Sequence, residues 1–308
     1  MKIFVTGATG FLGKHLCHRL EQQGHQVLGV SSKSCDLTDF QSLKAFDSYK
    51  FDQIYHLAAW TQAGDFCLKH PGEQWLINQK INTNILDWWV EKQPQAKMIA
   101  IGTSCSYDPI STLTEEEYLQ GVPIDSLFTY AMTKRMLLTG LIAIQKQFGL
   151  EYLYVIPSTL YGEGYHEDGR QMHFIFDLIR KILKGSLYND PVILWGDGEQ
   201  KRELIHVIDF ITALLELVKK AKNTWINIGS GQEFSIRQFA SAICKIVKYP
   251  IDKIQWDLSR YVGAKSKVLV IKKLKTFFPE FTTRPLEEGL IEVVQWFLAR
   301  EKTLVSIE

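Results

Sequence analysis

The chain begins with three glycines spaced three residues apart, Gly7, Gly10 and Gly13, directly after a short apolar run. In this spacing the first glycine permits a tight turn, the second lets the backbone approach a pyrophosphate, and the third lets a helix pack closely on the strand. A helix expected from Lys14 to Gln23 would turn its positive N-terminal end toward the phosphates. Such a triplet alone can be only a tight turn, but a second strand expected over Gln26–Val30 favours a dinucleotide site.

Short apolar runs alternate with longer amphipathic stretches through the first half of the chain. The expected strands are Ile3–Thr6, Gln26–Val30, Gln53–Leu57, Lys97–Ile101 and Tyr152–Ile156, and the expected helices cover residues 14–23, 38–48, 72–92 and 130–148. This alternation predicts an α/β fold of Rossmann type, in which a doubly wound parallel sheet has helices on both faces. In such sheets ligands bind at the carboxyl ends of the strands. Later patterns predict a helix over 206–221, a strand over Trp225–Ile228 and helices near 235–247 and 285–301.

The composition gives no support to several other classes of protein. The formal net charge of +1 over 308 residues provides no electrostatic reason to expect nucleic acid or a membrane surface as a partner. No apolar run reaches the roughly 18 residues that a membrane span needs. A strand is expected from the first residues, which leaves no room for a signal peptide. The five scattered cysteines form no metal or disulfide pattern, so we expect no metal and a reducing, cytoplasmic environment.

The residues that follow the second strand bear on the choice of cofactor. An NAD-selective site usually has a carboxylate here for the ribose 2′-hydroxyl. This chain has Ser31, Ser32 and Lys33 instead, which suit a 2′-phosphate and favour NADP(H) over NAD(H). A solvated loop with an incidental lysine is the alternative. Asp36 and Leu37 are expected near the adenine. The complete set of expected cofactor contacts is Gly7, Thr9, Gly10, Phe11, Leu12, Gly13, Ser31, Ser32, Lys33, Asp36, Leu37, Leu57, Ala58, Ala59, Tyr130, Lys134, Pro157 and Leu160.

Two polar residues near the third strand have structural interpretations. His56 is expected to be a hydrogen-bonded core histidine rather than a catalyst. Asn78, among apolar residues of an expected helix, is expected to brace neighbouring loops beneath the cofactor, with solvation of the helix face as the alternative.

Tyr130 and Lys134 are the pair of residues that most clearly indicates catalysis. Four residues apart, both side chains lie on one face of a helix. An ammonium group beside a phenol is expected to lower the pKa of the phenol from about 10 toward neutrality, which would make Tyr130 a proton donor or acceptor. Lys134 could also bind the nicotinamide ribose, and Thr103 could hydrogen-bond the reacting carbonyl. The spacing alone often arises by chance, but the glycines and Thr103 favour the catalytic interpretation.

These features resemble the extended short-chain dehydrogenase/reductases that modify nucleotide sugars, the NAD-dependent epimerase/dehydratase family, and the likeness runs nearly end to end. Within it, segments 102–105, 116–121, 157–162 and 195–209 are most similar to the GDP-L-fucose synthase branch. In that branch a cysteine and a histidine act as base and acid in epimerisation, and Cys105 and His173 stand at the matching places. The pair Ser104-Cys105 lacks the carboxylic acid that the family's 4,6-dehydratases use, so dehydration is not expected.

Both residue types suit this chemistry. A thiolate can remove a proton from carbon beside a ketone, and an imidazole can return one to the opposite face. The alternatives are that Cys105 is a small buried apolar residue and that His173 is a packing residue.

The resemblance also implies where the substrate binds. Lys181 and Arg202 could neutralise the diphosphate of a nucleotide sugar, Trp195 could contact the sugar or base, and Lys267, after Arg260–Gly263, resembles a late basic residue that faces the nucleotide. Solvation of the surface is the alternative role for these cations. Thr159, where the family usually has asparagine, is also expected near the substrate. The family further implies a homodimer, formed through the helices over 72–92 and 130–148.

The expected domains follow from the same likeness. Residues 1–165 and 205–234 are expected to form the NADP(H)-binding Rossmann domain, and residues 166–204 and 235–308 a smaller C-terminal α/β domain that binds the nucleotide sugar.

The sequence therefore predicts an NADP(H)-dependent epimerase-reductase, which carries out 3,5-epimerisation and then C4 reduction of a nucleotide-activated 4-keto-6-deoxy sugar. Thr103 stands where the branch usually has serine. The segment Trp60–Lys69 is unlike the loop that borders the sugar in that branch, which leaves open a different 4-keto sugar such as a heptose. A simple 4-keto reductase and a 4-epimerase that recycles bound NAD are alternatives within the enzyme class. A non-catalytic cofactor-binding scaffold or redox sensor is the alternative from another class.

Overall fold

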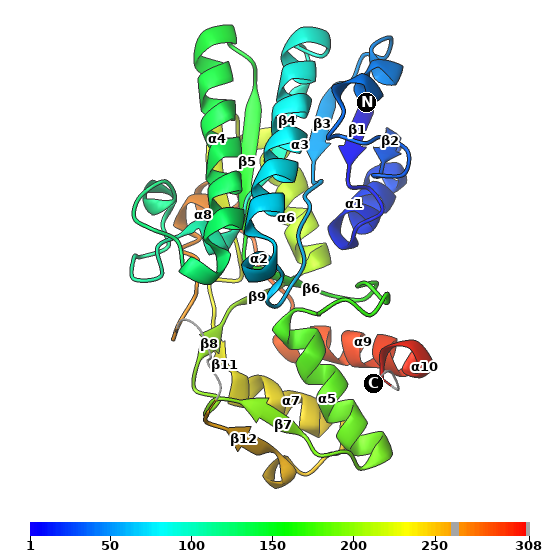
Figure 1. Ribbon diagram of the computed structural model, residues 1–308, viewed down its shortest axis with the longest axis vertical. Helices are drawn as coiled ribbons and strands as arrows, with labels where there is room; N and C mark the ends of the chain where they lie inside the picture. The colour runs from blue at the N-terminus through cyan, green and yellow to red at the C-terminus, as the bar shows by residue number, and fades with distance from the viewer. Residues whose placement is uncertain (260–264, 306–308) are drawn as a thin grey trace.

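The computed structural model describes residues 1–259 and 265–305, which form a larger and a smaller region stacked along the long axis of the molecule (Figure 1). The larger region contains one six-stranded sheet with helices on both faces. The smaller region, below it in Figure 1, contains three of the longer helices and short two-stranded sheets.

The six-stranded sheet is parallel throughout, with the strand order β10-β5-β4-β3-β1-β2. Parallel strands covered on both faces need near-continuous apolar sequence, and Ile3, Phe4 and Val5 of the first strand are all fully buried. The order reverses between β1 and β3, and a ligand crevice is expected at that point. The strands are β1 (Lys2–Thr6), β2 (Gln26–Val30), β3 (Gln53–His56), β4 (Lys97–Ile101), β5 (Tyr152–Pro157) and β10 (Thr224–Ile228).

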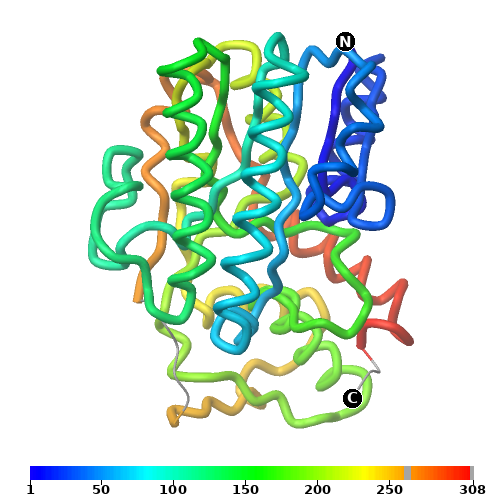
Figure 2. The backbone as a smooth tube through the Cα atoms, turned by 45° about the horizontal axis from the view of Figure 1, so that its top comes forward, coloured from blue at the N-terminus to red at the C-terminus, as the bar shows by residue number. Residues whose placement is uncertain are grey.

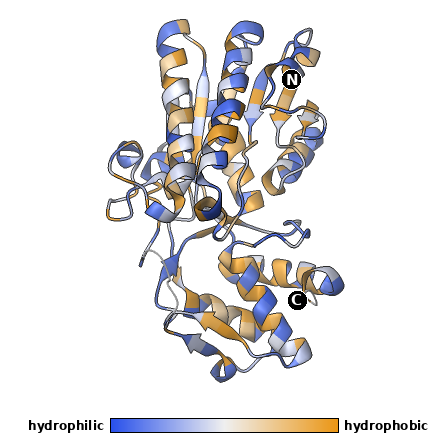
Figure 3. Cartoon of the chain, in the orientation of Figure 1, coloured by the Kyte–Doolittle hydropathy of each residue, from blue (hydrophilic) through white to orange (hydrophobic). Residues whose placement is uncertain are grey.

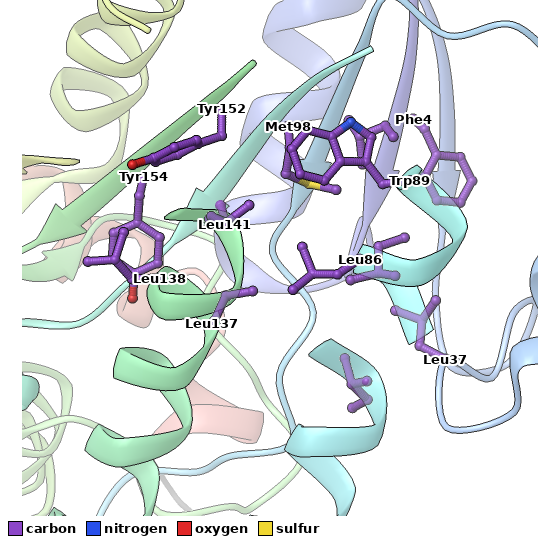
Figure 4. Close-up of a cluster of buried hydrophobic side chains, with 14 of the residues drawn as sticks. Phe4, Leu37, Leu86, Trp89, Met98, Leu137, Leu138, Leu141, Tyr152 and Tyr154 are labelled. Atoms are coloured by element: carbon purple, nitrogen blue, oxygen red, sulfur yellow. The ribbon is translucent and has the colours of Figure 1, made fainter. Parts of the chain in front are cut away.

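Two pairs of helices cover the two faces of this sheet (Figures 1 and 2). Helices α3 (Pro71–Lys92) and α4 (Phe128–Phe148) lie side by side on one face, and α1 (Phe11–Gln22) and α6 (Val207–Lys220) pack on the other. Figure 4 shows the core under α3 and α4, where Trp89 lies beside Met98 and Leu137 lies near Leu141. The stretch Asp125–Phe148 is long and apolar enough to cross a membrane. Within it α4 buries Lys134 and Arg135 as well as leucines, as a helix packed on a soluble core does.

The smaller region has an apolar core of its own. Its helices are striped with apolar and polar residues, as the hydropathy colours of Figure 3 show. These helices are α5 (Phe174–Tyr188), α7 (Ile236–Val247), α9 (Leu286–Leu298) and the short α10 (Glu301–Leu304). The paired strands are β7 (Ile193–Trp195) with β12 (Gln255–Asp257), and β8 (Lys201–Arg202) with β11 (Phe234–Ser235). Between the two regions β6 (Thr159–Tyr161) pairs in parallel with β9 (Leu204–His206).

The structure corrects three predicted helices. Helix α1 begins at Phe11 rather than Lys14, because the glycine loop itself forms the first turn. The stretch predicted as a helix over 38–48 is a 3₁₀ helix, η1 (Phe40–Phe46), whose three-residue turn places Phe40, Leu43 and Phe46 on one face. The helix predicted over 285–301 ends at Leu298, before α10.

The remaining helical elements are short and are distributed over both regions. They are α2 (Phe66–Lys69), α8 (Lys272–Phe277), η2 (Ser104–Ser106), η3 (Glu115–Glu117), η4 (Asp125–Leu127) and η5 (Ile251–Lys253). Helix α8 packs against α6 and β10 of the larger region, although the predicted domain division assigns it to the smaller one. The division itself stays a prediction.

Candidate active site

The glycine loop between β1 and α1 is packed too closely for side chains. Gly7 has a φ of +67°, a conformation that favours glycine, and a Cβ atom at Gly13 would lie 2.2 Å from the carbonyl oxygen of Gly7. The first turn of α1 receives no side-chain cap from Gly10. Backbone amides at an uncapped helix N-terminus bind anions, so these residues fit a cofactor pyrophosphate.

One cavity of about 820 Å³ joins this loop to the predicted catalytic residues. Thr103 and Cys105 enter it from the end of β4, Tyr130 from α4, and His173 from the start of α5. Among the predicted cofactor and substrate contacts, the cavity wall also contains Thr9, Gly10, Phe11, Leu12, Ala59, Pro157, Thr159 and Leu160. The crevice at the carboxyl ends of the strands therefore holds the three side chains to which the sequence assigns proton transfer, together with Thr103.

The predicted adenosine contacts lie at the end of β2. Ser32 and Lys33 are exposed there, and the strand end is tied to the glycine loop by a 3.0 Å hydrogen bond from the Ala8 amide to the Val30 carbonyl. The Asp36 carboxylate accepts hydrogen bonds from the amide and hydroxyl of Thr38, which lower its pKa. The side chain of Leu37 is buried in the core, and its contact with the adenine stays a prediction.

His56 and Asn78 have the structural roles expected of them. His56 is fully buried between Thr6 and Asn82, its ring nitrogens 3.0 and 3.1 Å from their oxygens, and burial lowers its pKa to about 4. The Asn78 amide both donates to the Trp60 carbonyl and accepts from its amide, each at 2.9 Å. It thus holds the loop after β3 in place.

The prediction that Lys134 lowers the pKa of Tyr130 is wrong. The Lys134 ammonium donates a 2.8 Å hydrogen bond to the Ile101 carbonyl, and burial lowers its own pKa to about 8. Burial, followed by the charges of Cys105 and other neighbours, raises the pKa of Tyr130 well above its ordinary value, against a small opposing effect of Thr103. Tyr130 is therefore a protonated phenol at neutral pH, which suits the donor of a proton to a carbonyl oxygen.

A buried polar network fixes Thr103. Its amide lies 3.4 Å from the Tyr118 hydroxyl, which is 2.9 Å from the hydroxyl of Tyr154. The Tyr154 hydroxyl in turn donates to the carbonyl of Lys134 at 2.9 Å. The strand end and the helix that carries Tyr130 are therefore connected through two buried phenols. This network was not predicted from the sequence.

Cys105 lies beside a cation that the sequence assigned to the nucleotide. The ammonium of Lys267 is 3.1 Å from the sulfur of Cys105. Burial opposes ionisation of the thiol, but the charge of Lys267, hydrogen bonds from Thr103 and Lys267, and the charge of Arg202 together lower its pKa. His173, across the cavity, is a neutral imidazole, because burial and the charges of His166 and Lys267 lower its pKa to about 4.

A second cavity, of about 450 Å³, opens on the other side of Cys105. Arg202 and Lys267 line it together with hydroxyl and aliphatic side chains. Lys181 and Trp195 line neither of these two cavities: Lys181 is paired with Asp177 at 2.9 Å and lies over the ring of Trp195, which is 54% exposed. The segment Arg260–Gly263, named with Lys267 in the sequence, lies outside the described residues.

Comparison with known proteins places the chain in a family. The sequence pattern of the NAD dependent epimerase/dehydratase family matches residues 3–229. The chain belongs to this family. The fold and family predicted from the sequence are thereby confirmed.

Three relatives give a finer comparison. The chain is 28% identical to GDP-L-fucose synthase of Escherichia coli, over 97% of both chains. It is 25% identical to a dTDP-4-dehydro-6-deoxy-D-allose reductase of a Streptomyces species, over 96% of this chain and 95% of the other. A GDP-L-fucose synthetase from Naegleria fowleri, solved with NADP bound, superposes with a TM-score of 0.87 at 26% identity, covering 99% of this chain and 96% of that one.

Several residues that line the cavities were not predicted from the sequence. Cys67 and the segment Gly164–Arg170 line the main cavity, and Glu203 is a buried carboxylate near the second. The glycines and charged residues between β6 and α5 are the only sequence signal for that segment. Its ordered course depends on tertiary contacts, such as the stacking of Tyr165 on Phe176.

Proposed function

We propose that the chain is an NADP(H)-dependent epimerase-reductase that acts on a 4-keto-6-deoxy sugar carried on a nucleotide diphosphate. The observation that supports this most strongly is the single cavity shared by the glycine loop, Thr103, Cys105, Tyr130 and His173. A plain reductase needs only the glycine loop, Thr103 and Tyr130. A thiol and an imidazole in the same cavity add the means to move protons at carbon.

The cofactor is NADP(H), and its binding residues are those of the larger region. The glycine loop and the start of α1 would hold the pyrophosphate, and Ser31, Ser32 and Lys33 the 2′-phosphate. The similar Naegleria enzyme binds NADP in the same fold. When bound, NADPH supplies the hydride for C4 of the sugar.

In the reduction, Thr103 orients the C4 carbonyl and Tyr130 donates the proton to its oxygen. Because burial keeps the phenol protonated before the reaction, Tyr130 starts in the form that the reductive direction requires. Lys134, tied to the end of β4, supports the phenol from the next turn of α4.

In the epimerisation, the Cys105 thiolate removes a proton from a carbon beside the 4-keto group, and the electron pair of the C–H bond passes into an enolate. His173 returns a proton on the opposite face. Because burial and the charges of His166 and Lys267 lower the pKa of this imidazole to about 4, His173 must take up that proton before it can donate it.

The remaining features of the substrate and the assembly are also proposals. Arg202 would bind the diphosphate, with Thr159 near the sugar, and Lys181 and Trp195 would meet the nucleotide only at the rim of the cleft. We propose a homodimer formed through the outer faces of α3 and α4, where Leu76 and Met136 are 61% and 43% exposed. All five cysteines are free, as in a reducing, cytoplasmic environment.

A second candidate function is 4-keto reduction without epimerisation. The similarity to a dTDP-4-dehydro-6-deoxy-D-allose reductase favours it, because that relative is named for reduction alone. A heptose substrate would be compatible with either activity, because the second cavity provides space beside Cys105.

The test is an assay of NADPH oxidation with a panel of nucleotide-activated 4-keto sugars, hexoses and heptoses, on GDP and dTDP. We expect sustained oxidation, in stoichiometric amounts, with at least one member of the panel. Conversion of a 4-hydroxy nucleotide sugar to its C4 epimer with no net change in cofactor would instead indicate a 4-epimerase. Cofactor binding without turnover of any sugar would favour the scaffold.

A further inference from the structure

The contact between Lys267 and Cys105 joins two parts of the chain that are 162 residues apart. Cys105 lies in η2, directly after β4 of the larger region, whereas Lys267 lies on the segment that returns from β12 toward α8. At 3.1 Å from the sulfur, the ammonium nitrogen of Lys267 is within hydrogen-bond distance of Cys105.

We propose that Lys267 keeps Cys105 in its thiolate form and so makes it a base, rather than binding the nucleotide alone. This proposal rests on the function proposed above, for which it supplies the origin of the basic group. Lys267 is in this sense a positioning residue, because it acts on the substrate through the sulfur of Cys105.

The backbone just after Lys267 is held by hydrogen bonds to two other parts of the chain. The amide of Leu269 donates to the buried carboxylate of Glu203 at 2.8 Å, and the other oxygen of that carboxylate accepts from the Gly231 amide at 2.7 Å. The Val270 amide donates to the Leu113 carbonyl at 3.1 Å, which ties the segment to the loop that follows Cys105. These backbone hydrogen bonds therefore help to hold the ammonium group of Lys267 beside the sulfur of Cys105.

The other groups around Cys105 do not replace this cation. Arg202 adds positive charge from β8, but its effect on the thiol is smaller than that of the Lys267 charge. Burial, and to a smaller extent the charge of an ionised Cys105, raise the pKa values of Tyr130 on α4 and Cys67 on α2, so both groups are neutral near pH 7. His173, at the start of α5, is neutral as well.

Cys67 provides a control within the same cavity. Its sulfur also lines the wall, but the neighbouring polar group is the neutral amide of Gln74, at 3.4 Å. Burial raises the pKa of Cys67, whereas the surroundings of Cys105 lower its pKa despite burial. Two thiols in one cavity thus differ chiefly in whether an ammonium group is beside them.

The test measures the rate of alkylation of each cysteine by iodoacetamide as a function of pH, without sugar or cofactor, with the modified residues located by peptide mass. Only the thiolate reacts, so the midpoint of the profile reports the ionisation of each thiol. In the wild type we expect Cys105 to react with a midpoint below about 8.5, the ordinary value for cysteine. In Lys267→Met we expect the midpoint to rise by one pH unit or more, which lowers the rate at neutral pH about tenfold or more.

Lys267→Arg should restore the low midpoint, because it restores the charge, and Cys67 should react alike in all three proteins. A midpoint for Cys105 that is the same in Lys267→Met and the wild type would overturn the proposal. So would a wild-type midpoint at or above that of Cys67. If the reagent does not reach Cys105, the ultraviolet absorbance of the thiolate, taken as the difference between each protein and its Cys105→Ser counterpart, gives the same midpoint.

The outcome does not depend on the identity of the substrate. A shifted midpoint in a protein that turns over no 4-keto sugar would support the role of Lys267 and contradict the proposed function. Turnover of a 4-keto sugar by a protein whose Cys105 midpoint is unshifted in Lys267→Met would support the proposed function and contradict the role of Lys267.

Discussion

The two walls of the main cavity are built differently. The wall from the larger region consists of strand ends and helix starts, in which Thr103 and Tyr130 are fixed by buried phenols and by the sheet itself. The wall from the smaller region consists mainly of the loop before α5, which ends at His173, while Lys267 lines the second cavity and reaches the sulfur of Cys105 from there. The first wall carries the residues proposed for reduction, whereas the proposed proton transfer at carbon also uses His173 of the second wall.

This difference predicts that mutation can separate reduction at C4 from proton exchange at the neighbouring carbons. Tyr130→Phe removes the proton donor for the C4 oxygen, and we expect reduction to fall by about 10²–10⁴-fold. Exchange of solvent deuterium into the unreduced 4-keto sugar, followed by mass spectrometry, should persist in this variant, because Cys105 remains. Loss of both activities together would mean that the two walls do not act independently.

The glycine loop should tolerate no added side chain at its third position. A Cβ atom in Gly13→Ala would meet the Gly7 carbonyl at 2.2 Å, and such overpacking typically costs about 1–3 kcal/mol. We expect weaker NADPH binding, measured by fluorescence titration, and a lower melting temperature. Gly72→Ala, where a Cβ atom meets nothing within 4 Å, is the matched control and should lower neither NADPH binding nor the melting temperature.

Acid should destabilise the larger region through its buried histidine. Folding lowers the pKa of His56 from 6.5 to about 4, so the folded chain must keep this imidazole neutral while the unfolded chain takes up a proton. The stabilisation is therefore complete above about pH 6.5 and is lost as the pH falls toward 4, with about 2 kcal/mol lost by pH 5. Chemical denaturation at pH 7.5 and 5 measures it, and His56→Gln should reduce the pH dependence. An unchanged dependence in that variant would assign the effect to other groups.

The smallest expected effect concerns the choice between cofactors. Lys33→Ala removes an exposed cation at the proposed 2′-phosphate site and should weaken NADPH binding about tenfold, with little change for NADH. Lys44→Ala, a cation of the neighbouring 3₁₀ helix, is the control. Equal losses for both cofactors would place the 2′-phosphate elsewhere.

The sequence predicted the larger region well because its signals are local. The glycine spacing, the alternation of strands and helices, and the four-residue separation of Tyr130 and Lys134 all depend on neighbours along the chain. The six strands of the main sheet were each expected within a residue of their ends.

The environment of the site could not be predicted in the same way. The raised pKa of Tyr130 comes from burial and from Cys105, and the placement of Lys267 against Cys105 needs two segments 162 residues apart. Lys181 and Trp195 were assigned to the substrate from resemblance, but the ion pair of Lys181 with Asp177 and the exposure of Trp195 leave them outside both cavities. Charge and residue type indicate what a side chain can do, whereas its partners are decided by the tertiary fold.

The most direct measurement is the deuterium content of the sugar produced by the wild-type protein from NADPH and GDP-4-keto-6-deoxymannose in D₂O. If Cys105 and His173 exchange protons beside the 4-keto group, the product carries solvent deuterium at C3 and C5, and Cys105→Ser removes that label. A fully reduced product with no deuterium at either carbon would contradict epimerisation and leave a 4-keto reductase.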